Sequence, residues 1–150
     1  MALNTLSFVD ARRSGSPNQV QRDYLDVAID GVPLRTLLDL GDVVSIFGWL
    51  EREHEGRMVR AVLLSEPSEL PSGRVPLYIC PECTDLGCGA VTVQIKRRGA
   101  EIVWSEFGHE NNYLAGFGPI EPAREFHFDE RSYRDAFGRF AWRRGGKRRR

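Results

Sequence analysis

Three cysteines within nine residues carry the clearest chemical signal in this sequence. They lie in the run Cys80-Pro-Glu-Cys83-Thr-Asp-Leu-Gly-Cys88. A Cys-x2-Cys pair in a tight loop lets two thiolates reach one tetrahedral ion, as in a zinc knuckle. Cys88 adds a third thiolate, so the run predicts a structural zinc site whose fourth ligand comes from elsewhere in the chain.

His109 is the candidate for that fourth ligand. Alternating apolar residues predict two strands, at 90–96 and 101–107, joined by a turn at Arg98-Gly99. If the turn has two residues, antiparallel pairing places Cys88 opposite His109. The expected site is therefore a tetrahedral zinc ion held by three cysteines and one histidine.

Two other interpretations of the cysteines remain open. The thiols pack as small hydrophobic side chains in one of them. In the other, Cys80 and Cys83 form the redox pair of a thiol-dependent oxidoreductase, with Cys88 as the resolving thiol. A helix N-terminus normally activates such a thiol by lowering its pKa. No helix is expected after Cys83, and this counts against the redox interpretation. If zinc is present but His109 is not a ligand, Asp85 or water takes the fourth position.

Motifs of common enzyme classes are missing from the sequence. It contains no phosphate-binding Walker loop, no dinucleotide-binding glycine pattern, no HExxH and no GxSxG. His109 and Glu110 could do acid–base work, but the neighbouring Asn111 favours an ordinary turn. The sequence therefore favours a non-enzymatic binding or regulatory protein, such as an immunity protein that blocks a toxin.

Charge is distributed unevenly along the chain. Seven of the 21 basic residues and none of the 21 acidic residues lie in 139–150, so residues 1–138 carry a net charge of −7. An acidic body suits a protein partner with a basic surface. The basic tail is either a solvated terminus or a nucleic-acid-binding segment. Its positive side chains are those of Arg139, Arg143, Arg144, Lys147, Arg148, Arg149 and Arg150.

The compartment is inferred from what the sequence lacks. The first residues do not resemble a secretory signal, and the longest apolar stretch, 43–50, is too short to span a bilayer. Three cysteines without such a signal indicate a reducing environment. We therefore expect a cytoplasmic protein with no membrane association.

Periodicity predicts a single α+β domain over 1–142, followed by a basic tail over 143–150. The expected core is an antiparallel β-meander with a C-terminal helix packed on the sheet. Asp129 should cap that helix, whose apolar stripe comprises Tyr133, Ala136, Phe137, Phe140 and Ala141. Strands are also expected at 24–30, 43–50, 75–80 and 124–128, and helices after Pro33 and over 51–66.

The cysteine run and its surroundings resemble a known family. The segment 73–113, with its CPEC-x-DLGCGAVT motif, is similar to a family of small uncharacterised bacterial proteins, chiefly actinobacterial. FHFDERSYRDAF, at 126–137, resembles the ending of the same family. Some members are labelled oxidoreductases, although this sequence shows no cofactor fingerprint. A histidine at position 109 is not part of the motif.

Overall fold

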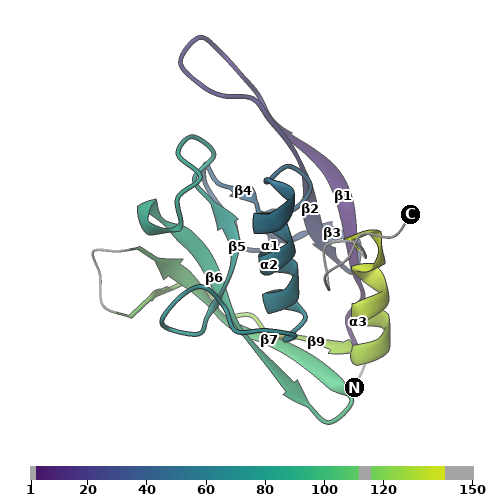
Figure 1. Ribbon diagram of the computed structural model, residues 1–150. Coiled ribbons are helices and arrows are strands. Elements are labelled where there is room, and N and C mark those ends of the chain that lie inside the picture. The colour runs from purple at the N-terminus through teal and green to yellow at the C-terminus, as the bar shows by residue number, and fades with distance from the viewer. Residues whose placement is uncertain (1–2, 112–115, 141–150) are drawn as a thin grey trace.

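The alternating pattern near 24–30 produces β2 (Arg22–Ile29), the central strand of a three-stranded antiparallel sheet. In the computed structural model, which describes residues 3–111 and 116–140, β2 pairs with β1 (Leu6–Arg13) and β3 (Val32–Pro33). β1 and β2 form a long hairpin that projects at the top of Figure 1. The tip of this hairpin, at 14–21, approaches the cysteine run, as described below.

A second antiparallel sheet contains the predicted meander. Its strands run in the order β4-β5-β6-β7-β8, and β9 pairs with another part of β7. The strand bounds are β4 (Val44–Ser45), β5 (Val75–Ile79), β6 (Ala90–Arg98), β7 (Glu101–Glu110), β8 (Gly118–Pro119) and β9 (Phe126–Asp129). This sheet supplies both ends of the cysteine loop.

Helices lie against the sheets (Figure 1). The predicted helix in the glutamate- and arginine-rich segment is confirmed as α2 (Arg52–Val62), and a short α1 (Leu34–Leu37) follows Pro33. α3 (Glu130–Ala136) begins at the predicted cap, because the Asp129 carboxylate accepts a bond from the Ser132 N–H at 3.0 Å. Short 3₁₀ turns form η1 (Leu86–Cys88) and η2 (Gly138–Phe140).

Aromatic side chains join the C-terminal helix to the rest of the core. Phe137 and Phe140 pack with Phe8 of β1, with ring centroids 5.3 and 5.4 Å from the Phe8 ring. Tyr133 is buried against Trp104 of β7. The C-terminal helix thus packs on the sheet, as the sequence predicted, and the chain is an α+β protein. Ala141 of the predicted stripe lies outside the described residues.

The predicted hairpin register is wrong. Arg98 pairs with Glu101, so the turn residues are Gly99 and Ala100. Gly99 has φ +64°, which glycine adopts without steric cost at the first position of such a turn. A bulge on β7 shifts the register again, and His109 therefore faces Val91 rather than Cys88.

Two segments also differ from the expected elements. The strand expected at 43–50 is only two residues long, because the chain then crosses to the other sheet, where the Leu25 N–H donates to the Phe47 carbonyl at 2.9 Å. The strand expected at 101–107 is longer than predicted, since β7 extends to Glu110 and pairs with β8. This extension places His109 on a strand.

Candidate metal centre

The cysteine loop connects two paired strands. Ile79 at the end of β5 pairs with Ala90 at the start of β6. Cys80 follows the first of these strands and Cys88 closely precedes the second, so antiparallel pairing brings the two ends of the loop together. Cys83 lies in the turn between them. A short helical turn, η1, follows Cys83, although no helix was expected there. It begins at Leu86 and ends at Cys88, so no cysteine lies at its N-terminus.

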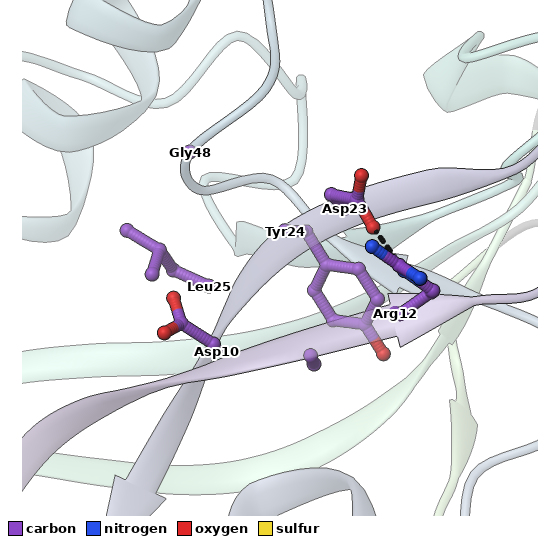
Figure 2. A pocket seen from close by; sticks show the side chains of 7 residues that line it. Asp10, Arg12, Asp23, Tyr24, Leu25 and Gly48 are labelled. Carbon is purple, nitrogen blue, oxygen red and sulfur yellow. Dashed lines mark hydrogen bonds and ion pairs between the residues drawn. The ribbon is translucent and has the colours of Figure 1, made fainter.

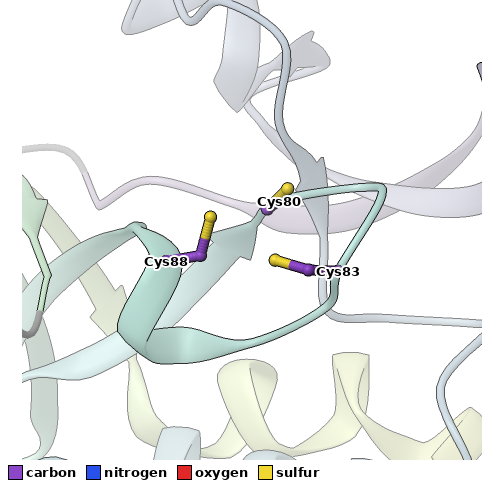
Figure 3. Close-up of side chains that lie close together, drawn as sticks. All are labelled: Cys80, Cys83 and Cys88. Atoms are coloured by element: carbon purple, nitrogen blue, oxygen red, sulfur yellow. The ribbon is translucent and has the colours of Figure 1, made fainter.

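The three thiols converge. Their Sγ atoms all lie within 4.8 Å of one another. Figure 3 shows Cys83 directing its sulfur towards the side chains of Cys80 and Cys88. Zn–S bonds of about 2.3 Å place the sulfurs of a tetrahedral site about 3.8 Å apart. Small side-chain rotations therefore suffice to bring all three sulfurs onto one ion.

The thiols of the cluster also differ in pKa. Burial opposes ionisation of Cys80, but the backbone N–H groups of Cys83 and Glu82, together with the neighbouring thiols, outweigh it and lower the pKa of Cys80. Hydrogen bonds with Cys83 and Cys80 raise the pKa of Cys88 to about 11. Cys80 therefore loses its proton more readily than Cys88, and metal binding would release the protons that remain on the three thiols.

A cleft of about 270 Å³ opens beside the cluster, and Cys80, Cys88, Asp42 and His109 line it. The close-packed group of ligand atoms contains the three cysteines and does not include His109. His109 is exposed at the end of β7, and its imidazole makes no hydrogen bond or ion pair with the described residues. Its imidazole is therefore available to the cleft, and its role as the fourth ligand stays a prediction.

Other oxygen donors near the cluster are already engaged. The Asp85 carboxylate caps η1 by accepting from the Gly87 N–H at 2.9 Å. Glu82 and Asp42 accept from Arg13 at 2.6 and 2.9 Å. Every Cys, His, Asp and Glu of the sequence lies in 3–111 or 116–140, the ranges that the structure describes.

The β1–β2 hairpin contacts the cysteine loop through a set of hydrogen bonds and ion pairs that we call the hairpin clamp. Arg13 bridges Asp42 and Glu82, and these bonds lower the pKa of both carboxyl groups. The Val20 N–H also donates to Glu82, at 3.2 Å. Arg22 donates to the Pro81 carbonyl at 2.9 Å. Pro81 and Glu82, the two residues between the first two cysteines, are therefore both held by the hairpin.

The clamp was not predictable from the sequence. Arg13 and Glu82 are 69 positions apart. Glu82 lies within the Cys-x2-Cys motif, but nothing in the sequence marks Arg13 as its partner. Opposite charges such as theirs are common on protein surfaces.

The other two histidines are structural. His54 lies 3.4 Å from Glu69 on the surface of α2, and so it has a partner that the sequence did not predict. His127 bonds Glu125 through Nε2 at 2.6 Å and Glu101 through Nδ1 at 3.1 Å. These two carboxylates raise the pKa of His127. Because they occupy opposite ring nitrogens, the three groups do not converge on one point.

A larger cleft, of about 470 Å³, runs along the β1–β2 hairpin (Figure 2). Arg12 and Asp23, on its wall, form an ion pair at 2.6 Å, which lowers the pKa of Asp23. Gly48 is required here, since its φ is +94° and a Cβ would lie 2.9 Å from the Leu25 side chain. No cysteine or histidine lines this cleft, so the reactive groups are concentrated at the cysteine loop.

Arg74 organises the end of β7 that carries His109. Its guanidinium donates to Thr92 Oγ1 at 3.0 Å and to Glu110 at 3.1 Å, and it also bonds the Glu106 carbonyl. Its side chain is 9% exposed and that of Glu110 is 12% exposed. Nothing in the sequence marks Arg74 as part of the site, although this buried network fixes the bulge of β7 and hence the position of His109.

Comparison with known proteins yields no match: no family model, no curated protein and no solved structure is similar to this chain. The proposed family resemblance stays a prediction. Within the described residues, no helix is long and apolar enough to span a bilayer. The basic segment 143–150, considered above for nucleic-acid binding, lies outside the described residues.

Proposed function

We propose that this chain is a binding or regulatory protein whose cysteine loop is held by a structural zinc ion. Cys80, Cys83 and Cys88 are the proposed thiolate ligands, and His109 is the proposed fourth ligand. The convergence of the three thiols within 4.8 Å carries the proposal. A set of sulfur and imidazole donors is typical of structural zinc, because soft thiolates and borderline imidazole match this ion.

His109 is proposed as the fourth ligand because its imidazole is available. It lines the same cleft as Cys80 and Cys88, whereas the nearby carboxylates of Asp42, Glu82 and Asp85 already accept bonds from the protein. Side-chain rotation at the end of β7 would bring its imidazole towards the thiols. A site closed by four protein ligands leaves no open position for substrate, which favours a structural role over catalysis.

In the binding role, the acidic body supplies the attraction to a partner. The net charge of −7 over residues 1–138 favours a protein partner with a basic surface, as in an immunity protein that neutralises a toxin. A structural ion would fix the shape of a loop that lies next to acidic side chains. Zinc would then support binding without contacting the partner.

The first test is to measure bound metal and free thiols in the untagged full-length protein, purified without chelator. We expect one zinc ion per chain and three thiols that react only after chelation. No bound metal, no uptake of added zinc and three freely reactive thiols would contradict the metal centre. The visible spectrum of the Co²⁺-substituted protein should change on His109→Ala, while His54→Ala, the matched control, should leave it unchanged.

The binding role is tested separately. We expect a stoichiometric basic partner to be retained from an extract of the native host at low salt and released at high salt. The zinc-free protein should retain less of it. If the zinc-loaded protein retains no stoichiometric partner under these conditions, the binding role is wrong even if the metal centre is present.

A further inference from the structure

Cys80 and Cys83 differ from Cys88 in the backbone that carries them. Both lie on one turn, in which the Thr84 N–H donates to the Cys80 carbonyl at 3.1 Å. On a helical turn, Cα atoms three residues apart are about 5 Å apart. This spacing falls within the range of about 4.4–6.8 Å between Cα atoms that a disulfide requires.

Cys88 is held more firmly. Its N–H donates to the Asp85 carbonyl at 3.1 Å, and the capped turn η1 ends at this residue. Gly89 alone separates it from Ala90, which is paired in the sheet. Moving Cys88 onto another sulfur would break the turn or the first pair of the β-ladder, whereas Cys83 lies outside any helix or strand.

Solvent reaches two of the three thiols, since Cys83 and Cys88 are exposed and Cys80 is half-buried. A small oxidant can therefore meet Cys83 from solvent, and it is the difference in backbone rather than access that favours its pairing with Cys80. The two sulfurs are already within 4.8 Å, and rotation of the side chains can close this gap to a bond of about 2.05 Å.

We propose that Cys80 and Cys83 form an oxidation site for hydroperoxides, and that their disulfide dismantles the metal centre and loosens the hairpin clamp. This inference rests on the proposed metal centre. The Cys83 thiolate attacks the peroxide O–O bond and becomes a sulfenic acid, with loss of hydroxide or alkoxide. The Cys80 thiolate then attacks that sulfur, forming the S–S bond and releasing hydroxide. Two thiolates, one peroxide and two protons from solvent thus give one disulfide, one alcohol or water, and one further water.

The disulfide removes two of the three thiolate ligands and leaves Cys88 as a free thiol. It also closes a small ring around Pro81 and Glu82, the residues that the hairpin clamp holds through Arg22 and Arg13. Because the three bonds from the hairpin to Pro81 and Glu82 depend on the shape of the turn, its contraction should release the tip of the hairpin at 14–21.

The test is a titration of the zinc-loaded, full-length protein with hydrogen peroxide. We expect one zinc ion to be released per disulfide, and peptide mapping to find a Cys80–Cys83 disulfide with Cys88 alkylated. Amide hydrogen exchange at 14–21 should accelerate on oxidation and slow again after reduction and zinc addition. Cys88→Ser should still form the disulfide, and Cys83→Ser should not.

Three results would overturn the proposal: a disulfide that contains Cys88, irreversible oxidation to sulfinic acid without a disulfide, or zinc and thiols that both survive peroxide. Unchanged exchange at 14–21 in the oxidised protein would remove the link to the clamp. The two proposals fail separately. A protein that never holds zinc but forms the Cys80–Cys83 disulfide contradicts the metal centre alone, whereas a zinc-loaded protein that resists peroxide contradicts the oxidation site alone.

Discussion

Replacement of Arg74 by Met should be among the most destabilising single changes in this sheet. The guanidinium and the Glu110 carboxylate are largely buried, with side chains 9% and 12% exposed. Removing one partner of a buried ion pair costs about 3–5 kcal/mol, because the other charge is left buried. Two hydroxyl groups, of Ser72 and Thr92, still donate to Glu110 and offset part of this cost. We therefore expect a loss of about 3 kcal/mol in the free energy of unfolding.

Urea denaturation of the purified protein provides the measurement. With a slope of about 2 kcal/mol/M, a loss of about 3 kcal/mol lowers the midpoint by about 1.5 M. Arg74→Lys should lie between the two proteins, because it keeps the charge but loses the planar fork. Arg57→Met is the matched control: its pair with Glu69 is 42% and 31% exposed, so at most about 1 kcal/mol should be lost. If Arg74→Met costs no more than this control, the network does not support β7 as argued.

Three further predictions follow from other contacts. Tyr133→Phe should cost about 1–3 kcal/mol by urea denaturation, since its buried hydroxyl bonds both the Trp104 N–H and a backbone carbonyl. Burial raises the pKa of Asp26, so the contribution of this carboxyl group to stability should be fully present below its pKa in the unfolded chain and should be lost as pH rises through its folded pKa; Asp26→Asn should remove this component of the pH profile of stability. Glu82→Gln should weaken zinc binding, measured by competition with a chelator, although Glu82 is not a ligand.

Elements with strong local signals were predictable from the sequence. The helix that Asp129 caps and the helix over Arg52–Val62 are both confirmed, because capping and an apolar face act within a few residues. The strands on either side of the cysteine loop are confirmed as well, because a short apolar run, in β5, and alternating apolar residues, in β6, both indicate a strand. The α+β class follows from these elements alone.

Register was not predictable to the same degree. A shift of one residue in the turn, followed by one bulge near Glu106, moved His109 from the position opposite Cys88 to that opposite Val91. The residues of the turn permit either register. The bulge depends on Arg74, which directly precedes β5 and bonds the Glu106 carbonyl. A site that needs residues from two strands is therefore harder to predict than one contained in a loop, such as the three cysteines.

Contacts between distant segments bear on function as well as on prediction. Arg13 and Arg22 hold the two residues between Cys80 and Cys83, so metal binding and the hairpin act on the same short turn. Thermodynamic linkage makes this coupling reciprocal: the factor by which an intact clamp strengthens zinc binding equals the factor by which zinc strengthens the clamp. Measuring zinc affinity in Glu82→Gln and hairpin exchange with and without zinc gives the same coupling from both sides. Unequal values would mean that Glu82 acts on the metal site by a route other than the hairpin.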